Sequence, residues 1–298
     1  MLFYPENIEI NHIDTANTSI KLLVARLDKI HPIVSGNKLF KLHYFLQDAL
    51  QSTHKTILTF GGAYSNHLVA TAFACKAYQL NCIGIVRGEK PQALSATLQQ
   101  CIKLGMQLHF ISREEYKNNE AESFTTDLKN KFGHFILIPE GGFSTQGAAG
   151  AAKIMDLLHH CNATHIATAT GTATTLAGLL MAANNKQQII SIPVIKNMTD
   201  IESRIKILTG KNQFNNLKIL GDYHFGGYAK KNTELINFIN SFYKKYTIPT
   251  DFVYTAKMMF GIMDQISKNY FPAESTIVCL HTGGLQGNHS LPSGTLIF

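Results

Sequence analysis

Residues 164–183 read THIATATGTATTLAGLLMAA, and this stretch indicates the fold class. It contains no Asp, Glu, Lys or Arg over twenty residues, so it could be mistaken for a membrane span. Six threonines, a histidine and Gly171 divide it, however, into an apolar run, a polar turn and a helical pattern. We therefore interpret it as a buried strand, a turn and a buried helix.

Outward from this stretch, the chain repeats the same alternation of short apolar runs and helical patterns. Predicted strands cover residues 22–27, 56–60, 82–86, 108–112, 135–138, 165–168, 189–194, 217–220 and 276–280. Predicted helices cover residues 38–50, 65–78, 95–104, 146–158, 174–182, 233–246 and 255–269. Strands that alternate with helices over such short connections predict an α/β fold with a mostly parallel, doubly wound sheet and helices on both faces.

The composition is that of a globular protein, with 45% apolar and 16% charged residues in 298. The net charge of +7 raises the question of a polyanionic partner. The lysines are scattered, however, and the chain has only four arginines, the residue that nucleic-acid binders favour for its fork onto phosphate. We predict no nucleic-acid partner.

The five cysteines show neither a CxxC pair nor the spacing of a zinc site, so we predict no metal and a reducing compartment. The start of the chain, MLFYPENIEI, has no basic region followed by an apolar stretch and does not resemble a signal peptide. We expect a cytoplasmic protein that does not associate with membranes.

Glycine-rich turns follow four of the predicted strands. They contain Gly61-Gly62, Gly141-Gly142, Gly171 and Gly283-Gly284. The carboxyl ends of parallel strands meet at one edge of a sheet, where ligands bind. Such turns allow the backbone to approach a bulky ligand that carries a phosphate.

A lysine opens a predicted helix in the motif SGNKLFK, residues 35–41. A cation at that place opposes the helix dipole, although Lys38 could simply be a surface residue. The chemical interpretation is an amine whose pKa is lowered by burial and by neighbouring cations, so that it is nucleophilic. Lys41, one turn later, is either that neighbouring cation or a phosphate contact.

Three further motifs follow strands. In TFGGAYSNH, residues 59–67, Ser65 and Asn66 begin a helix, which suits a carboxylate but is equally the pattern of an ordinary N-cap. Gly171 and the hydroxyls after it suit a phosphate, although the loop has neither the Walker A nor the GxGxxG pattern. In HTGG, residues 281–284, Thr282 could face an aromatic ring nitrogen.

The order of these motifs resembles the D-cysteine desulfhydrase and 1-aminocyclopropane-1-carboxylate (ACC) deaminase family. The segments, in order, are VARLDKIHPIVSGNKLFKL, FGGAYSN, PEGGFSTQGAAG, the TGT loop and HTGG, from about Leu22 to Gly284. The family consists of fold-type II pyridoxal-phosphate enzymes. The resemblance implies a large cofactor domain at residues 1–41 and 151–298, a small inserted domain at 42–150, and a homodimer.

The resemblance also implies roles for individual residues. Lys38 would bind pyridoxal phosphate as a Schiff base and act as the catalytic base. The other cofactor contacts implied are Lys41, Asn66, Gly171, Thr172, Ala173, Thr174 and Thr282. The other catalytic residues implied are Ser65, Tyr228 and Tyr254. The substrate contacts implied are Ser65, Asn66, His67 and Thr255.

Two positions separate the activities of the family. ACC deaminases carry Glu after the second tyrosine and Leu in HTGG, where this chain has Thr255 and Thr282. Threonines leave the ring nitrogen largely neutral, which suffices for β-elimination but not for opening a cyclopropane ring. The resemblance therefore favours the conversion of D-cysteine, a small amino acid, to pyruvate, hydrogen sulfide and ammonia. One departure is Phe40, which replaces the family's arginine.

Four alternatives stay open. ACC deaminase is the first, and a serine or threonine dehydratase or a sulfhydrylase of the same fold type is the second. A pyridoxal-phosphate-binding protein without catalysis is the third. A nucleotide-binding oxidoreductase is the fourth, although the chain lacks the glycine spacing that it requires.

Overall fold

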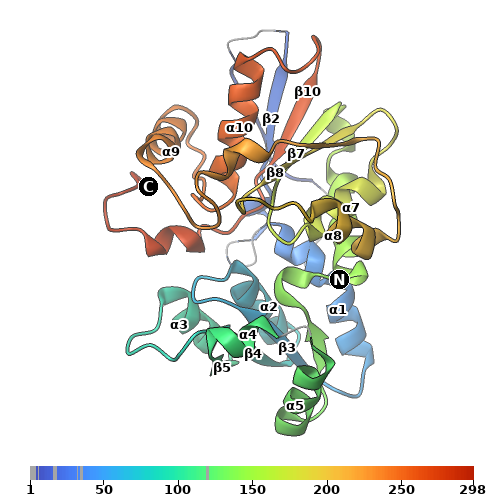
Figure 1. Cartoon of the computed structure of the whole chain (residues 1–298), viewed down its shortest axis with the longest axis vertical. Coiled ribbons are helices and arrows are strands. Elements are labelled where there is room, and N and C mark those ends of the chain that lie inside the picture. The colour runs from blue at the N-terminus through green and yellow to red at the C-terminus, as the bar shows by residue number, and fades with distance from the viewer. Residues whose placement is uncertain (1–4, 6, 16–18, 32, 34–35, 119–120) are drawn as a thin grey trace.

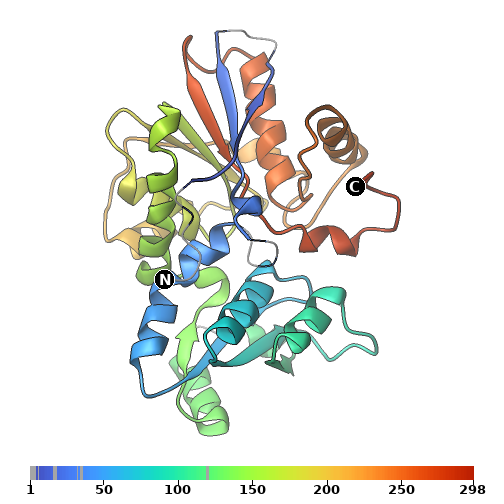
Figure 2. The ribbon, with the colours of Figure 1, turned by 180° about the vertical axis from the view of Figure 1, so that it is seen from behind.

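The computed structural model describes residues 5, 7–15, 19–31, 33, 36–118 and 121–298. Two sheets lie one above the other, with helix α1 (Asn37–Gln51) at their junction (Figure 1). Seen from behind, α1 runs from this junction along the lower half (Figure 2). The fold is α/β with mostly parallel sheets, as the sequence predicts.

The upper sheet has six strands in the order β1-β2-β10-β7-β8-β9. The bounds are β1 (Ile10–Ile13), β2 (Lys21–Ala25), β7 (His165–Thr170), β8 (Gln188–Pro193), β9 (Leu217–Ile219) and β10 (Thr276–Leu280). All neighbours are parallel except the edge strand β1, which pairs antiparallel with β2.

Successive side chains of a strand point to opposite faces of the sheet, so alternate residues of the upper sheet pack into two different hydrophobic cores. Leu23 and Val278 join the core that contains α7 (Thr174–Ala182) and α8 (Ile201–Thr209). Val24 and Cys279 join the core that contains residues of α9 (Thr233–Tyr246) and α10 (Thr255–Ser267). Helices therefore cover both faces of this sheet (Figure 1).

The lower sheet has four parallel strands in the order β5-β4-β3-β6. The strands are β3 (Thr56–Gly61), β4 (Asn81–Arg87), β5 (Met106–Ile111) and β6 (Ile136–Ile138). Its helices are α2 (Asn66–Ala77), α3 (Ala96–Lys103), α4 (Arg113–Lys117) and α5 (Glu122–Phe132). Strand–helix alternation thus builds a second layered unit rather than one continuous sheet.

Helices α1, α6 (Thr145–Ala152) and α7 pack against one another and join the two halves. At two glycines, the backbone of one helix lies directly against the backbone of the next. A Cβ added at Gly150 would overlap the carbonyl oxygen of Phe40, and one at Gly178 would lie 2.5 Å from the carbonyl oxygen of Ala148. Glycine at both places is what allows the helices to approach this closely.

The predicted elements agree with the structure to within a few residues, with four omissions. Strand β1 and helices α4, α5 and α8 are absent from the prediction. The predicted helix 146–158 ends earlier, at Ala152, and continues as a 3-10 helix, Lys153–Leu157. The domain boundaries predicted at 41/42 and 150/151 fall inside α1 and α6, and they stay a prediction.

The structure also bears on the uncharged stretch of residues 164–183, on membrane helices and on the cysteines. Residues 164–183 form β7, a turn and α7, as predicted. Within the described part of the chain, no helix combines the length and apolar character needed to cross a membrane. All five cysteines are buried free thiols.

The close contact between α6 and α7 leads to a prediction about stability. Gly178→Ala should favour helix formation by up to about 1 kcal/mol, but the new methyl group meets backbone atoms of α6 at 2.5 and 2.6 Å. Because backbone cannot move aside as a side chain can, we expect a net loss of about 1–3 kcal/mol in unfolding free energy, measured by urea denaturation. Gly221→Ala is the control, because nothing lies within 4 Å of its added Cβ. Equal stability of the two variants would refute a tight junction.

Candidate active site

A cavity of about 380 Å³ lies between the two halves, and strand ends of both sheets open into it. Its lining includes residues of the turns after β3, β6, β7 and β10. The glycine-rich turns singled out in the sequence therefore meet at one place. Most of the predicted site residues line this cavity, and they are Lys38, Lys41, Ser65, Asn66, His67, Gly171, Thr172, Ala173, Thr174, Tyr228, Tyr254 and Thr282.

Lys38 lies in the first turn of α1, and the residue before that helix explains its position. Gly36 has a φ of +77°, a conformation that side chains other than glycine rarely adopt, and a Cβ there would overlap the carbonyl of Thr282. The Asn37 amide donates to the same carbonyl at 3.1 Å. The helix start is thereby docked on the end of β10. Ser35, the first residue of the motif, lies outside the described residues.

The Lys38 amine is desolvated. Its Nζ donates to Asn37 Oδ1 at 2.7 Å and lies 5.9 Å from the centre of the Tyr254 ring. Burial lowers the pKa of Lys38 from 10.5 to about 8, against the opposing attraction of the Asp251 carboxylate. The amine is therefore much closer to its neutral, nucleophilic form at physiological pH than an exposed lysine is.

Lys41 is buried one turn later, and its Nζ donates to the carbonyl oxygen of Gly141 at 3.1 Å. Burial lowers its pKa, and the positive charge of Lys38 lowers it further. The charge of Lys38 thus acts on Lys41, and the two roles considered for Lys41 both stay predictions. Its hydrogen bond also fixes the turn after β6.

The loop after β7 presents the start of α7 to the cavity. Ala173 has a φ of +65°, a conformation rare for alanine, and its side chain offers no cap to the helix. The first turn of a helix has backbone N–H groups without intrahelical partners, and these bind anions. The hydroxyls of Thr172 and Thr174 lie 3.0 Å apart beside them. This arrangement suits a phosphate dianion.

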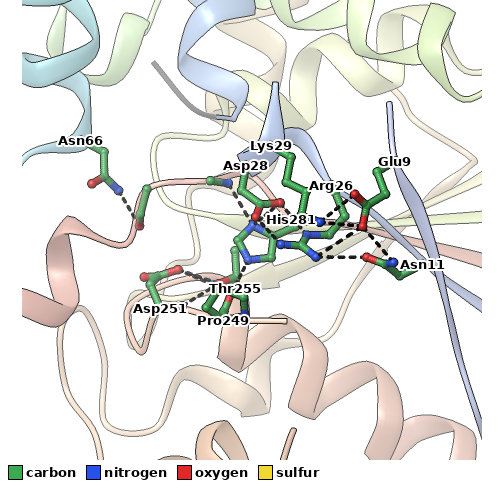
Figure 3. Close-up of polar contacts among 12 residues, drawn as sticks. Glu9, Asn11, Arg26, Asp28, Lys29, Asn66, Pro249, Asp251, Thr255 and His281 are labelled. Atoms are coloured by element: carbon green, nitrogen blue, oxygen red, sulfur yellow. Dashed lines mark hydrogen bonds and ion pairs between the residues drawn. The ribbon is translucent and has the colours of Figure 1, made fainter. Parts of the chain in front are cut away.

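The turn after β3 provides a second helix start. Ser65 Oγ accepts from the Leu68 amide at 3.3 Å, as an N-cap does. Asn66 Nδ2 donates to the Gly284 carbonyl at 3.1 Å, which ties the two halves together across the cavity (Figure 3). Asn66 Oδ1 is buried and has no hydrogen-bond partner among the described residues.

His67 has a defined tautomer. Thr59 Oγ1 donates its proton to the Ile138 carbonyl at 2.8 Å, so it must accept from His67 Nε2 at 2.9 Å. His67 Nδ1 therefore carries a lone pair, and this atom has no partner within the described chain. Burial, with the charges of Lys41 and Lys38, lowers the pKa of His67 to about 3. The imidazole is neutral and acts as a hydrogen-bond acceptor.

Two tyrosines face each other on the opposite wall. Tyr254 Oη donates to Tyr228 Oη at 3.4 Å, and the rings meet edge to face. The Tyr254 ring also lies against Gly171, where an added Cβ would be 3.2 Å from the ring. Burial raises the pKa of Tyr254, so its hydroxyl stays protonated at neutral pH. Tyr228 is half exposed, at 49% of its surface.

The sequence analysis missed the buried carboxylate of Asp251, which lines the cavity. Its oxygens accept from the amides of Val253, Tyr254 and Thr255, each at 2.9 Å, and from the Thr255 hydroxyl at 2.7 Å. These four donors occupy the acceptor positions of a carboxylate. Asp251 thereby fixes the backbone that presents Tyr254.

Thr255 is the one predicted site residue that the structure does not bring to the cavity lining. Its hydroxyl donates to Asp251 and accepts from the Asp251 amide at 2.9 Å, and the residue is fully buried. A substrate contact that takes the proton of this hydroxyl would break its bond to Asp251. Thr255 positions the Asp251 carboxylate, and the substrate contact predicted for it stays a prediction.

A second missed residue is Lys257 on α10, which is fully buried. Its ammonium group donates to the carbonyls of His224 at 2.8 Å and Gly227 at 2.7 Å. Phe225 and Ala229 in the same loop have positive φ values of 49° and 53°. Lys257 stabilises this strained loop, which carries Tyr228 to the cavity. Burial lowers the pKa of Lys257 to about 8.

The HTGG turn is supported from behind by a polar network (Figure 3). Arg26 donates to both carboxylate oxygens of Asp28, at 2.8 and 2.6 Å, and one of these oxygens lies 3.3 Å from His281 Nδ1. His281 Nε2 lies 2.6 Å from the Pro249 carbonyl, and Asn11 accepts from Arg26 at 3.0 Å. Strand ends that are far apart in sequence are thus fixed behind Thr282.

Comparison with known proteins points to one family. The model of the family described as "Pyridoxal-phosphate dependent enzyme" matches residues 8–283. A protein of Thermotoga maritima named "Putative 1-aminocyclopropane-1-carboxylate deaminase" is 30% identical over 286 residues, and the match covers 89% of each chain. A protein of Pyrococcus abyssi with the same name is 28% identical over 270 residues, which cover 85% of this chain and 81% of that one.

The fold agrees with these matches. The crystal structure of an ACC deaminase homologue is similar with a TM-score of 0.81 and 26% sequence identity. The similarity covers 96% of this chain and 92% of that chain.

The burial of Lys38 predicts how its amine titrates in the cofactor-free protein. Acylation of Lys38 by a trace of acetic anhydride, followed by peptide mass spectrometry, should show a midpoint near pH 8, because that is its lowered pKa. Since this pKa lies below the ordinary value, unfolding takes up a proton between the two values, and this lysine's contribution to stability rises with pH across that window. The same lysine in the urea-unfolded protein is the control, and its midpoint should lie near the ordinary value of 10.5. Equal midpoints would contradict desolvation.

Removing the Lys257 ammonium group should destabilise the loop that carries Tyr228. In Lys257→Met the carbonyls of His224 and Gly227 lose their donor, so we expect a loss of about 1–3 kcal/mol in unfolding free energy, measured by urea denaturation. The exposed Lys244→Met should change it by less than about 0.5 kcal/mol. A neutral effect of Lys257→Met would show that the two bonds do not stabilise the loop.

Proposed function

The chain belongs to the pyridoxal-phosphate dependent enzyme family, and from this premise we propose that it catalyses β-elimination on a small amino acid, with D-cysteine as the first candidate. The observation that carries the proposal is that a buried amine, Lys38, shares one cavity with the phosphate-binding loop Gly171–Thr174. The products from D-cysteine would be pyruvate, hydrogen sulfide and ammonia.

The residues of the cavity fit pyridoxal phosphate. The cofactor needs an amine of lowered pKa, an anion site and polar partners for its ring. Lys38 meets the first need and the helix start at Thr174 meets the second. The unpartnered atoms Asn66 Oδ1 and His67 Nδ1 are buried polar groups of the cavity-lining residues, and such groups in native proteins normally have partners.

We assign cofactor-binding roles accordingly. Lys38 would hold the aldehyde carbon, and the loop with Gly171, Thr172, Ala173 and Thr174 would hold the phosphate. Asn66 would contact the ring hydroxyl, and Thr282 would lie at the ring nitrogen. When bound, pyridoxal phosphate supplies an electron sink for the negative charge that develops at the α-carbon of an amino acid.

The α-proton would be removed by the Lys38 amine. A general base works best when its pKa is near the operating pH, and a pKa of about 8 meets this condition far better than 10.5. Burial of the amine is what lowers this value, and the Asp251 carboxylate opposes it. The amine is thus prepared by its surroundings before any substrate arrives.

The substrate carboxylate would bind at the turn that ends in Ser65. The start of α2 offers backbone N–H groups and the positive end of a helix dipole, and Ser65 offers a hydroxyl. His67 presents a neutral acceptor rather than a cation, so it is suited to orienting the substrate's amino group and not to carrying a proton. Fixing both groups orients the Cα–H bond toward the base.

Departure of the β-substituent would be assisted by a tyrosine. Tyr254 is protonated at neutral pH and can donate a hydrogen bond to a leaving thiolate. Its bond to Tyr228 connects it to the rim of the cavity. Asp251 positions the backbone of Tyr254, and Lys257 stabilises the loop that carries Tyr228. Neither residue would take part in the proton transfer.

ACC deaminase is the second candidate, because that is the activity in the names of the relatives. The argument against it is chemical. The position of the family's glutamate is Thr255, and the nearby carboxylate of Asp251 already accepts four hydrogen bonds, so neither residue offers a free carboxylate to keep the ring nitrogen protonated. The homodimer and the cytoplasmic location stay predictions, and membership of an enzyme family argues against the alternative of a non-catalytic binding protein.

A panel of D- and L-amino acids and ACC tests the proposal, with sulfide and keto acids measured side by side. We expect sulfide and pyruvate from D-cysteine, and no α-ketobutyrate from ACC. Lys38→Ala should lower the rate at least about 10²–10⁴-fold, because the base is lost, and borohydride should no longer fix the cofactor on the protein. Lys244→Ala is the matched surface control. Turnover of ACC alone, or borohydride fixation that survives in Lys38→Ala, would overturn the assignment.

A further inference from the structure

A second compartment adjoins the active-site cavity and encloses about 650 Å³. It lies at the carboxyl end of the lower sheet. Its ionisable and aromatic lining residues are Tyr64, Arg87, Arg113, Tyr116, Lys117 and Glu140. Tyr64, Arg87 and Glu140, with Gly62 and Ala63, line both spaces, so a molecule bound in the inner cavity has direct access to this outer compartment.

The outer compartment is electropositive. Arg87 ends β4, Arg113 and Lys117 lie on α4, and the one carboxylate in the lining is Glu140. In the part of the chain that the structure describes, none of these three cations forms an ion pair. Three cations against one carboxylate leave a net positive charge without an internal partner.

A buried tyrosine hydroxyl without a well-formed hydrogen bond also lies there. Tyr116 is only 5% exposed, and its Oη has no hydrogen bond of good geometry among the described residues. The Glu140 carboxylate lies near this hydroxyl and, after burial, is the next cause of its raised pKa. Arg87 lies over its ring, 5.5 Å from the centre. A buried hydroxyl whose hydrogen bonds are incomplete is stabilised when a ligand or water completes them.

The helix that carries these groups is well fixed. Ser112 and Glu115 form a capping box at the start of α4, with bonds of 2.8 and 3.1 Å, so Glu115 serves the backbone. Arg87 lies 3.5 Å from the position of a Cβ at Gly62, next to the turn assigned above to the substrate carboxylate. Arg87 therefore lies at the exit of the inner cavity, and the exposed side chains of Arg113 and Lys117 lie further out on α4.

We propose that the outer compartment binds a carboxylate at the far end of the substrate's β-substituent. This inference rests on the proposed function, because it assigns the inner cavity to the amino acid. It narrows the substrate class to β-substituted amino acids with an acidic tail, in which Arg113, Lys117 and the Tyr116 hydroxyl contact the tail. D-cysteine itself would fill only the inner cavity.

Two isosteric compounds test the proposal. S-carboxymethyl-D-cysteine and S-carbamoylmethyl-D-cysteine differ only in that the first ends in a carboxylate and the second in a neutral amide. We expect kcat/KM for elimination of the thiolate to be about tenfold or more higher for the carboxylate, which corresponds to about 1.4 kcal/mol. Both L-enantiomers are measured in parallel.

Variants assign the preference to the compartment. Arg113→Gln and Lys117→Gln should each lower the preference several-fold, and the double variant should reduce it to about one, with kcat/KM for the amide changed less than about twofold. Tyr116→Phe should also lower it. Lys129→Gln, which makes the same charge change on α5 outside the compartment, is the control and should leave the preference intact.

Equilibrium binding separates this inference from the proposed function. The borohydride-reduced holoenzyme does not turn over, and calorimetry gives the dissociation constants of both compounds. If no amino acid undergoes elimination but the carboxylate binds about tenfold more tightly in a manner that depends on Arg113 and Lys117, the compartment stands and the proposed function fails. Equal binding and turnover of the two compounds, or a preference unchanged in the double variant, would overturn the inference.

Discussion

The backbone contact between the start of α1 and the end of β10 is the constraint on which the site depends. The carbonyl of Thr282 accepts from the Asn37 amide and leaves no space for a side chain at Gly36. This contact places the Lys38 amine in a partly buried position between the two sheets, where its charged form is disfavoured. The reactivity of the lysine is therefore a result of packing several residues away from its amine.

The interior of the molecule contains three lysines and one aspartate whose charges affect one another. Lys38, Lys41 and Lys257 are all cations of lowered pKa, and the Asp251 carboxylate opposes that shift for Lys38 and Lys257. Asp251 is stable there because backbone amides, rather than an ion pair, satisfy its oxygens. The carboxylate can therefore moderate two buried amines without being neutralised by either.

The sequence predicted the fold because strands and helices alternate with clear periods, and it predicted most of the cavity lining because glycine turns follow the strands that meet there. Strand β1, by contrast, is a short edge strand whose pattern is weak, and α4 is only one turn and a half. Asp251 and Lys257 carry no motif of their own, because their roles depend on loops that are distant or irregular. The bond between Thr255 and Asp251 was not predicted either, because sequence spacing cannot tell which group the hydroxyl at a helix start meets.

The glycine contacts between α1, α6 and α7 have a mechanical consequence. Helices that meet backbone to backbone have no layer of deformable side chains on which to slide. Relative movement of the two sheets would then be a rotation with this junction as its axis. Lys38 lies in the first turn of α1, one of the three helices of this junction, so such a rotation would leave its place almost unchanged.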